Sequence, residues 1–97
     1  MDKKNNLVIL YDYYSNLLTD KQKSIFEDYY FNNFSLSEIS EYKEISRNAV
    51  HKQLKIIEDK LIDYENKLEL STKGKKIDII KNIIKDEKII KLIEEIE

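Results

Sequence analysis

Hydrophobic residues recur every three or four positions along most of this chain, the spacing that places them on one face of an α-helix. The first run predicts a helix near residues 5–17 and consists of Leu7, Leu10, Tyr11, Tyr14, Leu17 and Leu18. Thr19 and Gln22 have the spacing of a capping box, in which each side chain accepts a hydrogen bond from the other residue's backbone N–H. We therefore expect a second helix that starts after Thr19 and runs to about Tyr30 or Phe31.

A second capping box, Ser35-Leu36-Ser37-Glu38, predicts the start of a short third helix. The residues of this helix that we expect to face inward are Leu36, Ile39 and Tyr42. Lys43-Glu44-Ile45 is expected to form a tight turn, after which Ser46 is placed to cap a fourth helix beginning at Arg47. Two short capped helices joined by a tight turn are the arrangement of a helix-turn-helix motif.

The fourth helix has the most regular pattern in the chain. Its hydrophobic residues are spaced alternately four and three positions apart, at Val50, Leu54, Ile57, Leu61, Tyr64 and Leu68. This pattern carries the helix to about Glu69, a length of about 35 Å at 1.5 Å per residue. A three-helix unit does not need a helix this long. Its second half must therefore pack either against another part of the same chain or against a second copy.

The remaining chain is rich in isoleucine and predicts further helices. Ser71-Thr72-Lys73-Gly74 interrupts the preceding pattern. When the rest is placed on one helix, the earlier and later hydrophobic residues fall on roughly opposite sides. Because an amphipathic helix keeps one apolar face, we predict two helices, about 73–85 and 87–97, with Asp86 capping the second. The alternative is one helix that is apolar on all sides and buried in a dimer.

Hydrophobic residues on several sides of the tail favour a homodimer, because a protomer of this size cannot easily cover them all. The residues expected at the dimer interface are Leu61, Tyr64, Leu68, Ile89, Ile93 and Ile96. Among the aromatic residues, those expected in the core are Tyr11, Tyr14, Phe26, Tyr30 and Phe34. Tyr13 and Tyr29 are further candidates for a contact between subunits.

The composition narrows both the fold and the function. A chain of 97 residues forms one domain, with a helix-turn-helix core at 5–60 and, at 61–97, a long-helix extension and an Ile-rich tail. The absence of proline, with Gly74 as the single glycine, favours an all-α fold and argues against a phosphate-cradling loop. The chain has no cysteine and one histidine, His51, so we expect no metal, no cofactor and no catalytic site. Without a leader or an apolar run of membrane length, we expect a cytoplasmic protein.

The central segments also resemble a known motif. Glu38-Ile39-Ser40 and Ser46-Arg47-Asn48-Ala49-Val50, with Leu18-Thr19-x-x-Gln22 upstream, resemble region four of bacterial sigma factors over residues 18–60. This resemblance implies an all-α helix-turn-helix without a wing, in which the helix after Ser46 is the recognition helix.

Residues 9–70 resemble the YlxM family more closely than they resemble region four of sigma factors. The matching segments are Tyr13-Tyr14-Ser15, Leu17-Leu18-Thr19-Asp20-Lys21-Gln22, Tyr29-Tyr30, Ser35-Leu36-Ser37-Glu38-Ile39, Ser46-Arg47-x-Ala49-Val50 and Asp63-Tyr64-Glu65-x-Lys67-Leu68. The resemblance implies a small cytoplasmic bacterial protein with extra C-terminal helices that dimerises. The family's genes lie beside those of the signal recognition particle GTPases, which implies a regulatory or accessory role in that pathway. The sequence departs from the helix-turn-helix pattern at Glu44, where many such proteins have glycine, and residues 73–97 match the family only in pattern.

The outer face of the fourth helix is the candidate functional site. If Val50, Leu54 and Ile57 are buried, the residues left to bind nucleic acid are Ser46, Arg47, Asn48, His51, Lys52 and Lys55. Arginine contacts guanine, asparagine contacts adenine, and lysine and a capped helix N-terminus contact phosphate. Double-stranded DNA is therefore the expected partner. Residues 35–60 carry five basic and five acidic residues, so two alternatives stay open: a solvated helix surface, or a signal recognition particle protein or RNA as partner.

Overall fold

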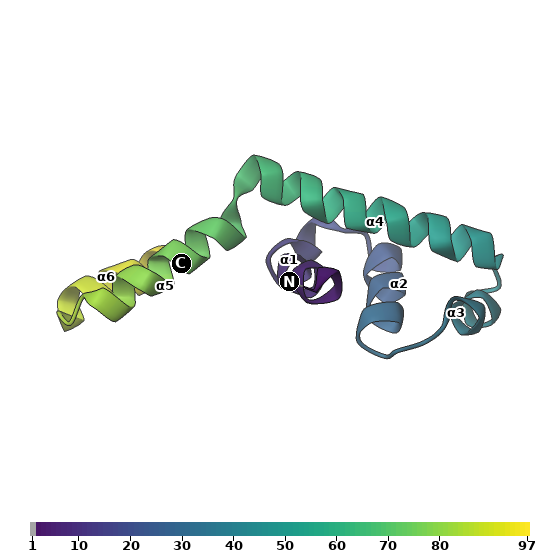
Figure 1. The fold of residues 1–97 in the computed structure, drawn as a ribbon, viewed down its shortest axis with the longest axis horizontal. Helices are drawn as coiled ribbons and strands as arrows, with labels where there is room; N and C mark the ends of the chain where they lie inside the picture. The colour runs from purple at the N-terminus through teal and green to yellow at the C-terminus, as the bar shows by residue number, and fades with distance from the viewer. Residues whose placement is uncertain (1) are drawn as a thin grey trace.

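Every regular element in residues 2–97, the part of the chain that the computed structural model describes, is helical. In chain order the elements are α1 (Lys3–Tyr14), the 3₁₀ helix η1 (Ser15–Leu17), α2 (Asp20–Tyr30), α3 (Leu36–Lys43), α4 (Arg47–Leu68), α5 (Leu70–Ile83) and α6 (Glu87–Ile96). The predicted all-α fold is confirmed. As Figure 1 shows, α4 lies across the first three α-helices and connects them to the C-terminal pair.

The helix starts follow from local side-chain chemistry. The Thr19 hydroxyl accepts a hydrogen bond from the Gln22 N–H at 3.1 Å, and the Gln22 side chain accepts one from the Thr19 N–H at 3.0 Å. Ser35 and Glu38 form the same reciprocal pair before α3. The Ser46 hydroxyl accepts from the third N–H of α4 at 3.0 Å. Each cap was predicted because it depends only on residues within one turn of the chain.

The hydrophobic core lies beneath α4 and takes side chains from α1, α2 and α3. Its buried members are Leu7, Leu10, Tyr11, Tyr14, Leu18, Ile25, Phe26, Ile39, Val50, Leu54, Ile57 and Leu61. Two residues expected in the interior lie at the surface instead. Tyr42 is 77% exposed, because α3 contributes only Ile39 to the buried core. Phe34 is 39% exposed, because it lies in the α2–α3 connection and lines a groove there.

The junction between α4 and α5 differs from the prediction. The chain turns at Glu69, whose φ of 53° is left-handed, and α5 already begins at Leu70. Residues 71–74, expected to interrupt the helices, are therefore helical.

Two side chains far from this junction in sequence explain the early start of α5. The Tyr14 hydroxyl accepts a hydrogen bond from the Leu70 N–H at 2.9 Å and donates one to Glu65 at 2.6 Å. The Glu65 carboxylate accepts from the backbone N–H groups of Ser71 at 3.1 Å and Thr72 at 3.2 Å. The first N–H groups of a helix need partners outside the helix, and here Tyr14 and Glu65 supply them.

The tail consists of two helices, so the single-helix alternative is excluded. α5 ends at Ile83, α6 begins at Glu87, and the Asp86 carboxylate accepts from the Lys88 N–H at 2.9 Å as predicted. An ion pair of 2.8 Å between Lys81 and Glu97 links the two helices. The hairpin extends away from the core, which gives the molecule dimensions of 55 × 25 × 24 Å (Figure 1). Its exposed hydrophobic residues include Ile79, Ile80, Ile83, Ile89, Leu92 and Ile96.

Candidate nucleic-acid interface

The turn between α3 and α4 fixes how α4 is presented. Glu44 has a φ of 56°, and its N–H donates to the carbonyls of Ser40 and Glu41. The Ile45 N–H donates to the Ser40 carbonyl at 3.2 Å, while the Ser40 hydroxyl donates to the Ile45 carbonyl. A left-handed residue with a side chain costs about 1–2 kcal/mol, and these hydrogen bonds help to hold it there. The turn thus adopts the tight form predicted, with glutamate in the conformation that glycine favours.

The predicted binding residues lie together on the exposed side of α4. Val50, Leu54 and Ile57 are buried against the rest of the core. The residues of this region that are exposed are Ser46, Arg47, Asn48, His51, Lys52 and Lys55. The structure therefore brings all six onto one surface, which we call the outer face.

One basic residue of the outer face, Lys55, forms an ion pair within α4. The Lys55 ammonium lies 3.1 Å from the Asp59 carboxylate, one turn further along α4. Both side chains are more than half exposed, so water screens this pair and it stabilises the helix by about 0.3–0.5 kcal/mol. Within residues 2–97, Arg47 and Lys52 take part in no ion pair. Their charges are available to a polyanion.

A groove that the sequence did not predict adjoins the outer face. It has a volume of about 810 Å³ and lies between the start of α1, the end of α2 and α4. Its lining residues are Lys3, Lys4, Tyr29, Tyr30, Asn33, Phe34, Leu36, His51, Leu54, Lys55 and Glu58. His51 and Lys55 belong to both the outer face and the groove, which makes the two surfaces continuous.

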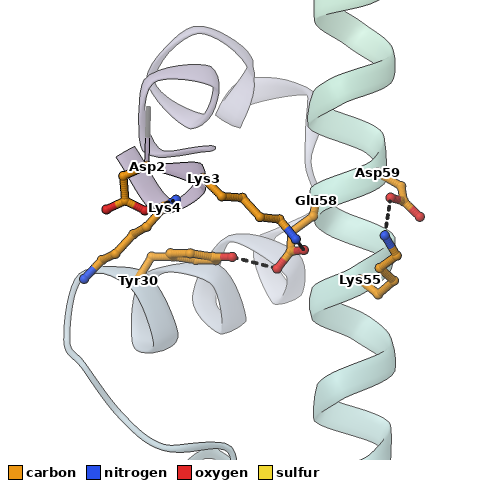
Figure 2. Close-up of polar contacts among 7 residues, drawn as sticks. All are labelled: Asp2, Lys3, Lys4, Tyr30, Lys55, Glu58 and Asp59. Atoms are coloured by element: carbon orange, nitrogen blue, oxygen red, sulfur yellow. Dashed lines mark hydrogen bonds and ion pairs between the residues drawn. The ribbon is translucent and has the colours of Figure 1, made fainter. Parts of the chain in front are cut away.

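Glu58 is the carboxylate within the groove, and two neighbours bind it. Figure 2 shows the Lys3 ammonium and the Tyr30 hydroxyl converging on Glu58 from α1 and α2, at 3.7 Å and 2.6 Å. Burial raises the pKa of Tyr30, and the hydrogen bond to Glu58 and its negative charge raise that pKa further. The phenol therefore stays protonated and continues to donate to Glu58. Sequence reasoning missed Lys3 and Lys4, because nothing local indicates that the start of α1 lies beside α4.

Comparison with known sequences identifies the family. Residues 1–97 match UPF0122, a family described as "Putative helix-turn-helix protein, YlxM / p13 like". The chain belongs to the UPF0122 family. The resemblance to the YlxM family, inferred above from short segments, is thereby confirmed over the whole chain.

Curated UPF0122 proteins from several bacteria are similar to this chain. A relative from Caldanaerobacter subterraneus subsp. tengcongensis is 52% identical over 82 residues, covering 80% of this chain and 70% of the relative. One from Thermoanaerobacter sp. strain X514 is 45% identical over 101 residues, covering 93% and 86%. One from Ureaplasma parvum serovar 3 is 39% identical over 95 residues, covering 98% and 96%. The match to UPF0122 proteins therefore includes the C-terminal hairpin as well as the helix-turn-helix.

The residues expected at a dimer interface do not form one exposed surface in this UPF0122 protein. Leu61 is completely buried in the protomer, so its side chain is a core residue and not a contact for a second copy. Tyr64 packs on Tyr14, with ring centroids 5.9 Å apart, and is partly buried. By contrast, Leu68 and Ile89 are each 43% exposed and Ile96 is 79% exposed. Ile93 has intermediate exposure.

The described part of this UPF0122 protein was compared with the requirements of a metal-binding cluster and of a membrane-spanning helix. Across residues 2–97, no three His, Cys, Asp or Glu residues come close enough together to hold a metal ion. None of the helices there has both the length and the apolar character needed to cross a membrane. The family description names a helix-turn-helix protein and no enzymatic activity.

Proposed function

We propose that this UPF0122 family member binds double-stranded DNA through the outer face of α4. One observation carries the proposal: the exposed side of the first turns of α4 presents Arg47, Asn48 and Lys52 without a carboxylate anywhere between residues 47 and 55. A helix that follows a helix-turn-helix turn enters the major groove with its N-terminal residues toward the bases. Arg47, Asn48 and Lys52 all lie within the first two turns of α4, the part that would face the bases.

The side chains of the outer face suit different parts of the DNA. Arg47 can donate two hydrogen bonds to guanine, and Asn48 can pair with adenine. Lys52 and Lys55 are placed to neutralise phosphates, and the start of α4 at Ser46 can hold another. Lys55 can leave Asp59 at little cost because that ion pair is exposed. On this proposal, base recognition depends on Arg47 and Asn48, and the phosphate contacts of the other outer-face residues supply most of the affinity.

A homodimer is part of the same proposal. The helix-turn-helix region is electrically neutral as a whole, so one copy supplies too few phosphate contacts for tight binding at physiological salt. The C-terminal hairpin exposes hydrophobic side chains, among them Ile83 at 73% and Ile96 at 79%, that a second copy can cover. Replacing Ile89 and Ile96 with lysine is expected to halve the mass measured by sedimentation equilibrium. An unchanged mass would contradict this interface.

A second candidate function follows from the balance of charge. Five acidic residues offset five basic ones in residues 35–60, and Glu44 lies exposed in the turn where it would repel a DNA backbone. With the resemblance to the YlxM family, this balance favours an accessory role in the signal recognition particle pathway. In that role the same fold contacts a protein or RNA of the particle rather than duplex DNA.

One binding experiment separates the two candidates. Fluorescence anisotropy with a mixed-sequence DNA duplex, repeated across a salt series, measures the affinity and its salt dependence. For DNA binding, log affinity falls against log salt with a slope of about −0.9 for each phosphate contacted. The test variant replaces Arg47, Lys52 and Lys55 with glutamate. The control makes the same change at three exposed lysines outside α4, namely Lys21, Lys75 and Lys88.

Loss of duplex binding in the test variant, with binding kept in the control, would support the outer face as the DNA surface. Equal loss in both would assign the effect to net charge and contradict the proposal. An unmodified chain that fails to bind duplex even at low salt would exclude DNA binding. The signal recognition particle RNA and GTPases would then be tested with the same two variants.

A further inference from the structure

We propose that the groove between α1, α2 and α4 holds the sugar–phosphate backbone that flanks the bases facing α4, with Lys3 and Lys4 as phosphate ligands. This inference rests on the proposed DNA binding and adds to it a second set of contacts from α1, outside the helix-turn-helix motif. These contacts would fix the position of the protein on the duplex without selecting its sequence.

Continuity with the outer face is the first support. His51 and Lys55 line the groove and also belong to the outer face, so a strand leaving the bases beside α4 passes directly over the groove. The α4 residues that line it run from His51 to Glu58, a length of about 10 Å at 1.5 Å per residue. An occupant that touches both ends and also reaches α1 must be extended, which suits a backbone better than a single small anion.

Charge is the second support. The lining residues include three lysines, from α1 and α4, against the single carboxylate of Glu58. Lys3 is paired with Glu58 and Lys55 with Asp59, and both lysines are exposed enough for phosphate to replace those partners. The chain as a whole has a net charge of −2, so the groove is positive on a molecule that is otherwise slightly negative. The Lys3 side chain is 73% exposed and remains accessible from solvent while it contacts Glu58.

Neutral hydrogen-bond donors complete the groove. Tyr29 and Asn33 line it from the end of α2 and the α2–α3 connection. Tyrosine hydroxyl and asparagine amide groups commonly donate to phosphate oxygens in protein–DNA interfaces. Figure 2 shows that Lys3 reaches Glu58 while the Lys4 side chain points away from it. Among residues 2–97 the Lys4 ammonium takes part in no ion pair, although the Asp2 carboxylate lies nearby and accepts a hydrogen bond from the Lys4 backbone N–H at 3.0 Å. Lys4 therefore has no ion pair to break when phosphate binds.

On this proposal the negative charge of Glu58 opposes phosphate binding in the groove. Removing that charge should therefore strengthen duplex binding. In Glu58→Gln the side chain can still accept the Tyr30 hydrogen bond but no longer carries the charge that holds Lys3. Duplex binding is expected to become tighter and its salt slope steeper by up to about 0.9, the value of one added phosphate contact. Unfolding cannot produce a gain of this kind.

The decisive measurement compares salt slopes for duplex binding. Lys3→Gln with Lys4→Gln is expected to make the slope shallower by about 0.9–1.8, since a full phosphate contact is worth about 0.9. Lys4 supplies one full contact, and Lys3 supplies the part of a contact that its pairing with Glu58 leaves available. Affinity should fall by the same factor on every duplex sequence, because backbone contacts carry no base preference. The matched control is Lys75→Gln with Lys76→Gln, an adjacent exposed lysine pair on α5. It is expected to leave the slope unchanged.

The outcomes separate this inference from the proposed function. A reduced slope in the Lys3 and Lys4 variant and a steeper slope in Glu58→Gln together would support the groove. If outer-face variants abolish binding while the slope is unchanged in the Lys3 and Lys4 variant, the groove inference is overturned and DNA binding by α4 stands. If the unmodified chain does not bind duplex, both are overturned.

Discussion

Removing the Glu65 carboxylate tests how the C-terminal hairpin is attached. This side chain accepts hydrogen bonds from the Tyr14 hydroxyl, from the Ser71 and Thr72 N–H groups and from the Thr72 hydroxyl. In Glu65→Ala all four donors lose their partner at once. We expect the variant to have a clearly lower free energy of unfolding.

The size of this decrease in the free energy of unfolding depends on which of the four donors are buried away from water. Tyr14 is completely buried and Ser71 is 4% exposed, so each loses an acceptor that water does not replace, at about 1–3 kcal/mol apiece. Thr72 is exposed, and water can satisfy its two donors. Removing the partly buried carboxylate also ends the cost of keeping it away from water, which offsets part of the loss. The expected net decrease is about 2–3 kcal/mol.

Urea denaturation followed by circular dichroism measures this decrease. Asp63→Ala is the matched control, because it removes a carboxylate that is 54% exposed and pairs with Lys67 at 2.9 Å. Such a pair contributes less than about 0.5 kcal/mol. If Glu65→Ala lies as close to the unmodified protein as this control does, the reasoning that Glu65 holds the start of α5 is wrong.

The pH dependence gives an independent check. Burial tends to raise the pKa of Glu65, but hydrogen bonds from Tyr14, Thr72 and Ser71 outweigh it and hold the pKa below its usual value of 4.5. A carboxylate whose pKa is lower when folded stabilises the fold fully above its unfolded pKa, and the stabilisation is lost as pH falls through the folded pKa. Glu65→Gln does not titrate. The stability difference between the unmodified protein and Glu65→Gln should therefore shrink as the pH falls below the usual value of 4.5.

Three further predictions concern the turn, the cap and the core. Glu44→Gly should stabilise the protein by about 0.5–1 kcal/mol in urea denaturation, because glycine adopts the φ of 56° without strain. A loss of stability would show that the Glu44 side chain itself stabilises the turn. Ser46→Ala should cost about 1 kcal/mol and Ser46→Asp should restore most of it, since aspartate also caps a helix; equal losses in both would contradict the capping role. Leu61→Ala should lower the free energy of unfolding by about 2–5 kcal/mol. The control Ile62→Ala, at a position 40% exposed, should lower it by less than about 1 kcal/mol. Similar losses in the two variants would contradict the burial of Leu61.

Sequence reasoning succeeded where the chemistry is local. The caps at Thr19, Ser35 and Ser46 each involve residues three positions apart, so they could be identified from spacing alone. The exposed side of α4 was also predicted, because the spacing of Val50 and Leu54 determines which side is buried. These two kinds of pattern were sufficient to predict the fold and the six residues of the outer face.

The predictions that failed depend on contacts between distant parts of the chain. The spacing of α4 places Leu61 on its buried side but does not say whether α1 or a second copy covers it. The start of α5 depends on Tyr14, 56 residues before the Leu70 N–H that it binds. The groove depends on α1 bringing Lys3 next to Glu58. No periodicity or motif predicts these contacts between distant residues, because they depend on how the helices pack against one another.

The single-residue junction at Glu69 makes the C-terminal hairpin a lever arm. α5 has 14 residues and therefore extends about 21 Å from its pivot. A rotation of about 10° at Glu69 would displace the far end of that arm by about 4 Å, more than half a helical turn. Tyr14 and Glu65 act at the short end of the lever, within three residues of the pivot. Hydrogen bonds to two side chains thus act where a small rotation has its largest effect on the position of the hairpin tip.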